Sequence, residues 1–302
     1  MTGGILITGA SGFIGKNLIA DSFFKSSTSI GRTRPESDIS HVFANFGSTT
    51  DYEAHLNGIH TVVHLAGRAH IIGEDNLTER ALMHEINTQG TLNFAEQCAR
   101  SGIKKFIFIS SAKVLGEKTE PGAPFSHHSK IDPSGSYALS KADAEVSLIS
   151  ICKKYSMNYT IIRPPLIYGP GVKGNVRSLK SLIKWSIPLP FGRVDNRRSM
   201  VSMSNLIDLI KVCINSEAAN NETFLVSDNN DLSTVDLINL ISKQSHTNSV
   251  VFDCPLVALK TIFVIVGRKQ QFLKLTQSFQ VDISHTTETL NWHPRPIDTI
   301  AF

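Results

Sequence analysis

Near the start of the chain, three glycines spaced three apart connect a short apolar run to a segment with helical periodicity. Residues 4–8 suit a buried parallel strand, and from Lys16 onward apolar residues recur at helical spacing. Gly9 and Gly12 would let the backbone turn tightly and approach a pyrophosphate, while Gly15 would let the helix pack closely against the strand. We therefore predict a dinucleotide-binding turn, with candidate contacts at Gly9, Ser11, Gly12, Phe13, Ile14 and Gly15.

Strand-like and helix-like stretches alternate as far as Pro165. Strand patterns occupy residues 28–33, 42–44, 61–65, 105–110 and 159–163, and helical spacing covers residues 79–101 and 137–155. Such alternation predicts an α/β fold with a Rossmann-type, doubly wound parallel sheet.

Beyond Pro165 the pattern loosens and shows no repeat or clear linker. Helices are expected at residues 205–215, 234–244 and 256–266, and a strand at 223–226. We expect residues 1–166 to form the dinucleotide-binding Rossmann domain, with segments near 199–227 returning to it. Residues 167–302 would mainly form a smaller C-terminal lobe that binds the substrate.

The composition is that of an ordinary globular chain, with 302 residues, 41% hydrophobic and 19% charged. The net charge of +4 is modest and spread out, so nucleic acid is not an expected partner. The middle of the chain is locally basic and would suit an anionic small molecule. Its cations are Lys173, Arg177, Arg193, Arg197 and Arg198.

Cysteine usage and the apolar runs bear on location. The four cysteines form no C-x-x-C pair, so we interpret them as free thiols of a reducing compartment and expect no metal site. The first strand begins too early to leave room for a signal peptide, which favours the cytoplasm. The apolar run 255–267 contains Lys260 and is too short to cross a bilayer. We interpret it as a core or lobe helix, with peripheral membrane contact as the alternative.

Tyr137 and Lys141 stand four residues apart in a predicted helix and would project from the same face. A phenol with an ordinary pKa of about 10 is a poor proton shuttle at neutral pH, but a fixed positive charge lowers its pKa. The pair could therefore relay a proton to or from a sugar or alcohol oxygen. A core tyrosine beside a solvated lysine is the alternative.

Five motifs together resemble the extended short-chain dehydrogenase/reductase superfamily, in its branch of nucleotide-sugar epimerases, dehydratases and reductases. They occupy residues 8–15, 64–66, 110–116, 137–141 and 163–170. The resemblance implies Tyr137 as general acid/base, Lys141 lowering its pKa and holding the nicotinamide ribose, and Ser111 bonding the reacting oxygen. It also implies that Asn87 supports the site from behind. Further implied cofactor contacts are Leu65, Ala66, Gly67 and Pro164.

The predicted second strand ends without the acidic residue that binds the ribose hydroxyls in NAD-preferring members of this superfamily. Arg32 and Arg34 stand there instead and could pair with a 2′-phosphate, so NADP is favoured and NAD is the alternative. Solvated loop arginines are the other interpretation of this pair. Asn45 occupies the position of an aspartate that binds the adenine amino group, and its amide oxygen can accept the same bond.

The resemblance also implies a UDP-sugar substrate, with Asn175 and Arg198 holding the nucleotide and diphosphate and with Ser111 and Lys113 near the sugar. Arginine suits this role because its planar guanidinium pairs with two phosphate oxygens. A surface charge pair is the alternative for Arg197 and Arg198. Homodimers are common in this superfamily, so a homodimer is expected.

The wording of several motifs resembles bacterial enzymes of the UDP-N-acetylquinovosamine dehydrogenase type, which act in surface-polysaccharide synthesis. They reduce the 4-keto group of a UDP-4-keto-6-deoxy-N-acetylhexosamine with NAD(P)H. A UDP-hexose 4-epimerase is the first alternative, although Leu115 and Leu166 replace a tyrosine and an asparagine common in epimerases. A non-catalytic sensor that binds the cofactor is the second alternative.

Overall fold

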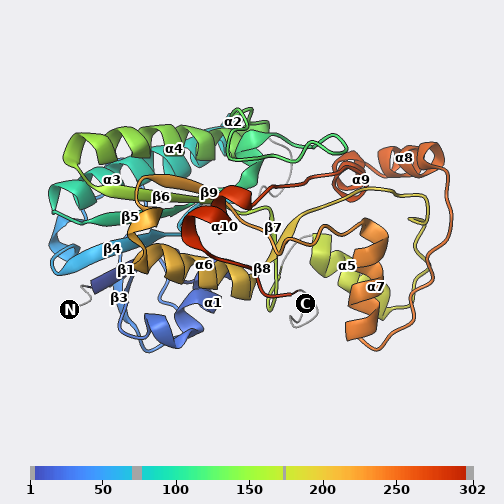
Figure 1. Cartoon of the computed structure of the whole chain (residues 1–302), viewed down its shortest axis with the longest axis horizontal. Helices are drawn as coiled ribbons and strands as arrows, with labels where there is room; N and C mark the ends of the chain where they lie inside the picture. Colours follow the sequence, from blue (N-terminus) through green and yellow to red (C-terminus); the bar gives the residue numbers. More distant parts are fainter. Residues whose placement is uncertain (1–3, 70–76, 173–174, 297–302) are drawn as a thin grey trace.

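The computed structural model describes residues 4–69, 77–172 and 175–296. Its centre is a parallel sheet of seven strands in the order β3-β2-β1-β4-β5-β6-β9 (Figure 1). The strands are β1 (Gly4–Thr8), β2 (Thr28–Gly31), β3 (Ser40–Phe43), β4 (Ile59–His64), β5 (Lys105–Ile109), β6 (Asn158–Arg163) and β9 (Glu222–Leu225). The predicted Rossmann-type parallel sheet is confirmed.

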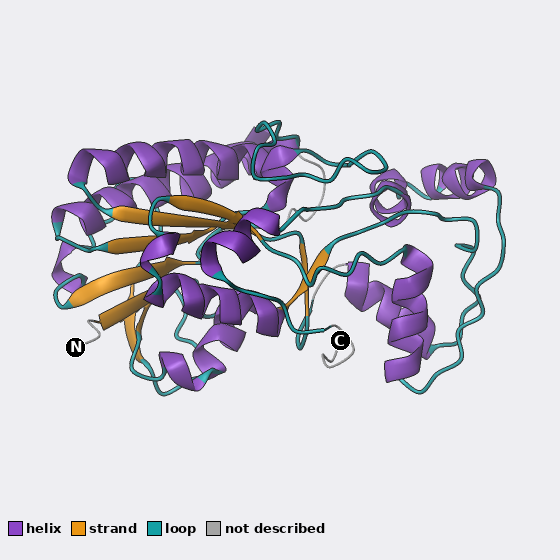
Figure 2. Cartoon of the chain, viewed as in Figure 1, coloured by secondary structure: helices purple, strands orange, loops and turns teal. Residues whose placement is uncertain are grey.

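Helices cover both faces of the sheet (Figure 2). One face carries α2 (Leu77–Met83), α3 (Gly90–Arg100) and α4 (Gly135–Tyr155), and the other carries α1 (Phe13–Ala20), α6 (Met203–Asn215) and α10 (Ser284–Leu290). Neighbouring strand residues alternate between the two cores. Leu6, Val62 and Phe106 pack under α3 and α4, whereas Ile7, Val63 and Ile107 pack against the opposite layer.

The helix predicted at 79–101 is divided. A π-helical segment, His84–Gln89, separates α2 from α3. Asn87 lies in this segment and is fully buried. Single π-helical turns inside α-helices occur frequently at functional sites, because the wider turn re-aims side chains.

The rest of the chain builds a lobe beyond the carboxyl ends of the strands (Figure 1). β7 (Leu166–Tyr168) and β8 (Met200–Ser202) form a small parallel sheet at its base. The lobe contains α5 (Asn175–Lys184), α7 (Thr234–Gln244), α8 (Leu256–Ile265) and α9 (Lys269–Thr276). A separate apolar core joins these helices, and it includes Leu179, Ile183, Ile238, Ile241, Leu259 and Phe272.

Four short 3-10 turns complete the described elements, at Ser22–Phe24, Glu53–His55, Ala112–Leu115 and Glu217–Ala219. No described helix is long and apolar enough to cross a membrane. The run at 255–267 does form a lobe helix, but most of α8 is exposed, and Leu259 is its buried residue. Of the two possibilities, a core helix or a lobe helix, the structure has the lobe helix.

Candidate active site

The three predicted catalytic side chains lie together at the carboxyl end of β5. Ser111 follows β5 by two residues, and Tyr137 and Lys141 lie in the first turns of α4. Ser111 faces the Tyr137 phenol closely enough for hydrogen bonding to lower the pKa of that phenol, and the Ser111 hydroxyl accepts from the Lys113 amide at 3.2 Å. The Lys141 ammonium donates to the Ile109 carbonyl oxygen at 3.0 Å and lies 4.5 Å from the centre of the Phe108 ring. Such a group can hold an alcohol or ketone oxygen against a phenol.

Burial dominates the acid-base properties of this group. It raises the pKa of Tyr137 to about 12, and the hydrogen bond with Ser111 only partly opposes the rise. Burial also lowers the pKa of Lys141 to about 8. The expected lowering of the Tyr137 pKa by Lys141 is not found, because the ammonium is turned toward the end of β5.

Glu145 is a site residue that the sequence reasoning missed. It lies one turn beyond Lys141 on α4, is almost fully buried, and its carboxylate raises the pKa of Lys141 against the effect of burial. Arg163 at the end of β6 donates to both carboxylate oxygens, at 3.1 and 2.6 Å. The signal was present in the i, i+4, i+8 spacing of Tyr137, Lys141 and Glu145.

Asn87 lies behind the catalytic helix, as the resemblance implied. Its amide donates to the Ser140 hydroxyl at 2.9 Å and to the Arg68 carbonyl oxygen at 3.0 Å. Ser140 in turn donates to the Tyr137 carbonyl oxygen at 2.8 Å. The π-helical segment is thereby tied both to α4 and to the turn after β4.

The glycine-rich turn has the geometry that a pyrophosphate site needs. A Cβ on Gly9, whose φ is +70°, would lie 2.7 Å from the Ala66 nitrogen, and one on Gly15 would lie 2.2 Å from the Gly9 oxygen. Gly9 therefore allows the β1 turn to touch the β4 turn, and Gly15 allows α1 to pack on that turn. Gly12 caps α1 without a side-chain hydrogen bond, so the first amides of α1 can face an anion.

The turn after β4 completes this cradle. The Thr8 hydroxyl accepts from the amides of Leu65 and Ala66, at 3.1 and 2.9 Å. A Cβ on Gly67 would lie 3.1 Å from the Asn87 Oδ1 atom and 3.5 Å from the Lys141 ammonium. Glycine at this position keeps the backbone close to the catalytic lysine. The predicted contacts at Ser11, Phe13 and Ile14 are half-buried around the same turn.

The residues proposed to hold the adenosine end are differently placed. Arg32 and Arg34 follow β2 directly and are exposed. Asn45 is also exposed, and its carbonyl oxygen accepts from the Tyr52 hydroxyl at 3.0 Å. Pro164 is buried, and its carbonyl oxygen accepts from the Ala112 amide at 2.9 Å beside Ser111.

Beyond Ser111, the charges of Lys113, Glu117, Arg198 and Lys274 lie close enough to act on one another. Lys113 pairs with Glu117 at 2.9 Å. Burial lowers the pKa of Arg198, while Glu117 raises it, and Lys274 of α9 has a pKa lowered by burial and by Lys113 and Arg198. We call Lys113, Arg198 and Lys274 the cation cluster. Asn175 opens α5, but its side chain lies outside the described part of the chain.

Arg198 is held by its backbone neighbours. Its amide donates to the Leu232 carbonyl oxygen, and its own carbonyl oxygen accepts from the Leu232 amide, both at 3.0 Å. Its guanidinium donates to the Gln277 carbonyl oxygen at 2.8 Å.

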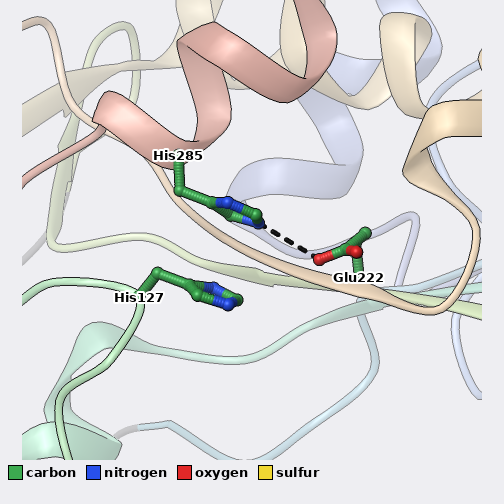
Figure 3. A group of neighbouring side chains, drawn as sticks. All are labelled: His127, Glu222 and His285. Carbon is green, nitrogen blue, oxygen red and sulfur yellow. Dashed lines mark hydrogen bonds and ion pairs between the residues drawn. The ribbon is translucent and has the colours of Figure 1, made fainter.

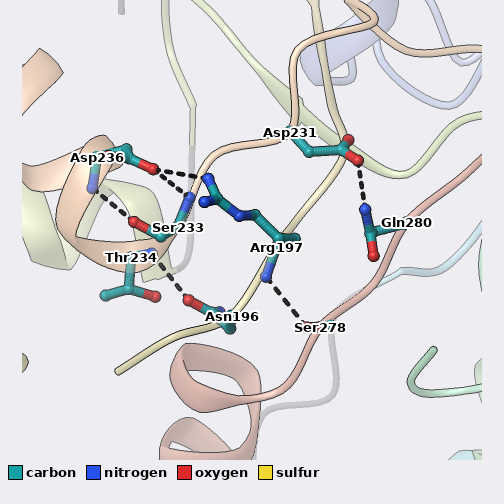
Figure 4. Close-up of polar contacts among 8 residues, drawn as sticks. All are labelled: Asn196, Arg197, Asp231, Ser233, Thr234, Asp236, Ser278 and Gln280. Carbon is teal, nitrogen blue, oxygen red and sulfur yellow. Dashed lines mark hydrogen bonds and ion pairs between the residues drawn. The ribbon is translucent and has the colours of Figure 1, made fainter. Parts of the chain in front are cut away.

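Figure 4 shows the polar contacts around this segment, including Arg197 with Asp236 and Gln280 with Asp231. Arg197 thus forms an exposed ion pair with Asp236 at 3.4 Å and is not part of the cation cluster.

A second group of polar side chains lies outside the active site. His127, Glu222 and His285 have ligand-type atoms within 4.8 Å of one another (Figure 3). His285 pairs with Glu222 at 3.1 Å, and its ring stacks on His127 with the centres 3.8 Å apart. Zinc-binding nitrogens must converge on one point at about 2.0–2.1 Å, and stacked rings direct them side by side instead. The contacts fasten α10 to β9.

The chain is similar to several known proteins. A UDP-glucose 4-epimerase of Vibrio cholerae is 41% identical over 96% of this chain and 90% of its own length. An N-acetyl-α-D-glucosaminyl-diphospho-ditrans,octacis-undecaprenol 4-epimerase of Escherichia coli O157:H7 is 31% identical over 79% of this chain and 71% of its own. A crystal structure of a UDP-glucuronic acid 4-epimerase from Bacillus cereus, in complex with NAD, shares the fold. Its TM-score is 0.76 at 20% identity, and the match covers 96% of this chain and 93% of that one.

The sequence profile of the NAD dependent epimerase/dehydratase family matches residues 5–226, which extend from β1 to the end of the main sheet. The matched range contains the glycine-rich turn and the group of Ser111, Tyr137 and Lys141. With the match to the Vibrio cholerae relative over nearly the whole chain, this range shows that the chain belongs to the NAD dependent epimerase/dehydratase family.

Proposed function

We propose that this enzyme is a 4-epimerase of UDP-linked hexoses or N-acetylhexosamines. The observation that carries the proposal is the placement of Ser111, Tyr137 and Lys141 beside the dinucleotide-type cradle, with Lys113 of the cation cluster two residues after Ser111. The names of the two relatives support 4-epimerisation. They favour the UDP-hexose 4-epimerase, which was the first alternative from the sequence, over the 4-keto reductase, which was the preferred interpretation.

A nicotinamide dinucleotide, when bound, supplies the group that accepts and returns a hydride. Tyr137 takes the proton from the sugar 4-hydroxyl as that carbon is oxidised, and it returns the proton to the same oxygen on reduction. The Ser111 hydroxyl fixes the oxygen, and the positive charge of Lys141 favours the phenolate form of Tyr137, which is the form that accepts the proton. Because burial raises the pKa of Tyr137 and the Lys141 ammonium donates to Ile109 in this structure, the assignment requires that ammonium, one helical turn away, to face the phenol in the complex.

The cation cluster would hold the diphosphate of the substrate. Three cations and one carboxylate leave a net positive charge, which the negative diphosphate would compensate. The Arg198 guanidinium also presents its donors in a fixed plane. Lys274 would supply a second basic side chain from the C-terminal part of the chain.

A 4-keto reductase remains the second candidate because of one observation. Leu166, which replaces an asparagine common in epimerases, begins β7 and is 38% exposed. An apolar side chain there offers no hydrogen bond to a diphosphate. A reductase would consume the reduced cofactor, whereas an epimerase would return the hydride to the sugar and leave the cofactor oxidised after each turnover.

The test mixes the purified protein with NAD(H) or NADP(H) and either UDP-hexoses or UDP-4-keto-6-deoxy-N-acetylhexosamine. An epimerase interconverts the C4 epimers, seen by NMR, with no lasting change in the absorbance of the reduced cofactor. Continuing consumption of the reduced cofactor with the keto sugar establishes the reductase instead. No turnover of either substrate class, with the cofactor bound, supports the non-catalytic sensor.

Two variants assign the site. Tyr137→Phe should bind cofactor and UDP normally but lose about 10²–10⁴-fold in turnover, the scale of a lost general acid. Turnover within a few-fold of the native enzyme would remove Tyr137 from the mechanism.

Arg198→Ala should weaken UDP binding by about 1.5–3 kcal/mol and leave cofactor binding unchanged. An unchanged UDP affinity would exclude Arg198 from the diphosphate site.

A further inference from the structure

Helix α8 presents an apolar surface to solvent. Eight of its ten residues are apolar. Val257 and Ile265 are 78% and 79% exposed, and Ile262, Val264 and the following Val266 are about half exposed. The lobe core uses only Leu259 and Phe263, which are four residues apart on one stripe. A helix that served only this core would be polar on its remaining faces.

The apolar surface extends beyond α8 itself. Val250 and Phe252, in the segment that leads into α8, are 58% and 46% exposed. Their backbones pair with Leu189, which holds them at the lobe surface. Figure 1 places α8 at the end of the molecule farthest from the sheet, so no other described layer covers it. A helix that leaves this many apolar side chains exposed marks a contact with another molecule or with a membrane.

The charge around α8 indicates which contact. From Cys254 to Val281 the chain has no aspartate or glutamate, but it has Lys260, Arg268, Lys269 and Lys274. Lys260, Arg268 and Lys269 are exposed, and none forms an ion pair within the described residues. Asp253, before α8, pairs with Arg193, so the unpaired charges next to this apolar helix are positive. That combination matches a bilayer surface, whose headgroups are anionic and whose acyl region is apolar.

We propose that α8 docks on the surface of an anionic lipid bilayer. A ten-residue helix is about 15 Å long, so it can lie in the headgroup region but cannot span the membrane. Its apolar side chains enter the acyl boundary, and Lys260, Arg268 and Lys269 contact lipid phosphates. The contact realises the peripheral membrane interaction that the sequence left open for residues 255–267.

The docked helix lies close to the active site along the chain. α9 follows α8 after Gly267 and carries Lys274 of the cation cluster toward its end. One short helix therefore connects the membrane-facing surface to the proposed diphosphate site. Membrane docking itself does not depend on the proposed function, because it rests on α8 alone.

The experiment is vesicle flotation of the full chain. Vesicles of phosphatidylethanolamine with phosphatidylglycerol should carry the native protein upward, and vesicles of phosphatidylcholine alone should carry at least tenfold less. Raising salt should reduce binding to the anionic vesicles. Native protein that stays in solution with the anionic vesicles at low salt overturns the proposal.

Variants separate the membrane from other partners. Val257→Glu with Ile265→Glu should lower vesicle binding at least tenfold, and Lys260→Gln with Arg268→Gln and Lys269→Gln should remove the preference for anionic lipid. The control is Val146→Glu on α4, which is 61% exposed but distant from α8, and it should bind as the native protein does. Because the altered side chains are exposed, the melting temperature and UDP binding should stay unchanged.

Three results would overturn the membrane assignment. Equal vesicle binding by the Val257→Glu, Ile265→Glu variant shows that α8 is not the contact. Equal loss of binding in Val146→Glu shows that the effect is not specific to α8. Conversion of a native dimer to monomer by the α8 variant, without vesicle binding by the native protein, assigns this surface to a second copy. Vesicle binding without turnover would contradict only the proposed function.

Discussion

Lys141 shows how single residues set the chemistry of this site. Its ammonium is buried beside Phe108 and Ile109, which lowers its pKa to about 8, and the carboxylate of Glu145 limits the fall. Lys141 is therefore charged at neutral pH and loses its charge as pH rises through about 8. If its positive charge supports the phenolate of Tyr137, activity should fall over the same range.

Glu145→Gln tests this role. The substitution removes the carboxylate that raises the Lys141 pKa, so the alkaline fall in activity should move to lower pH. Arg163→Lys is the control, because it disturbs the same buried ion pair but leaves the carboxylate in place. The pH profile of activity, measured with the melting temperature, distinguishes the cases. An alkaline limb that moves equally in both variants would reduce Glu145 to a structural residue.

Arg32 and Arg34 should decide the choice of cofactor. They follow β2 with no carboxylate on the strand end, and Glu36 instead pairs with Lys16 at 3.6 Å. We expect NADPH to be used at least as well as NADH. Arg32→Ala with Arg34→Ala should weaken NADPH on the order of tenfold and spare NADH, which is the internal control.

Salt should erode the NADPH advantage, because exposed ion pairs are screened. Steady-state kinetics with both cofactors at two ionic strengths measures the effect. A native enzyme that favours NADH tenfold or more in catalytic efficiency contradicts the assignment of these arginines.

Among the elements, the junction of β1 and α1 could be read from the sequence almost completely. Its glycines are close together in the sequence. At each of them a Cβ atom would lie too close to backbone a few residues away or to the turn after the adjacent strand. The helix at 79–101 was predicted without its π-helical segment, because that turn follows from bonds of Asn87 to Arg68 and Ser140. Such long-range bonds leave no trace in hydrophobic periodicity.

The Gly9 contact gives a prediction for this junction. Gly9→Ala should destabilise the protein and abolish cofactor binding, since its Cβ would meet Ala66 and Leu65 within 3 Å. Gly102→Ala is the matched control, because it has a similar φ of +78° but open space around it. Gly102→Ala should lower the free energy of unfolding by the backbone strain alone, about 1–2 kcal/mol. Equal losses in melting temperature would show that strain, and not the contact between the two turns, governs Gly9.

At the scale of the whole molecule, the sheet and two helices of the lobe, α7 and α8, were predictable, whereas the small sheet of the lobe and its cation cluster were not. The run Phe106–Ile109 in β5 is continuous and apolar because both faces of that strand are buried, whereas β4 is fully buried only from Val62 to His64. β7 and β8 have three residues each, too few to show a pattern, and the cation cluster joins Lys113 to residues 85 and 161 positions later. The exposure of α8 was also hidden, because an apolar run has the same composition whether it is covered or not.

The lobe and the sheet have separate apolar cores, and this separation predicts unequal stability. Ile241→Ala removes a fully buried side chain from the lobe core, at a cost of about 2–5 kcal/mol. Amide hydrogen exchange should accelerate in α5, α7 and α9 and stay unchanged in β4 and β5, because few apolar contacts transmit the loss. Ile107→Ala, equally buried in the sheet, is the control and should accelerate exchange throughout.

UDP should slow amide hydrogen exchange in the lobe of the native protein, since Arg198 and Lys274 lie at the boundary of the two cores. If Ile241→Ala accelerates the sheet as much as the lobe, the molecule unfolds as one unit and the lobe has no independent stability.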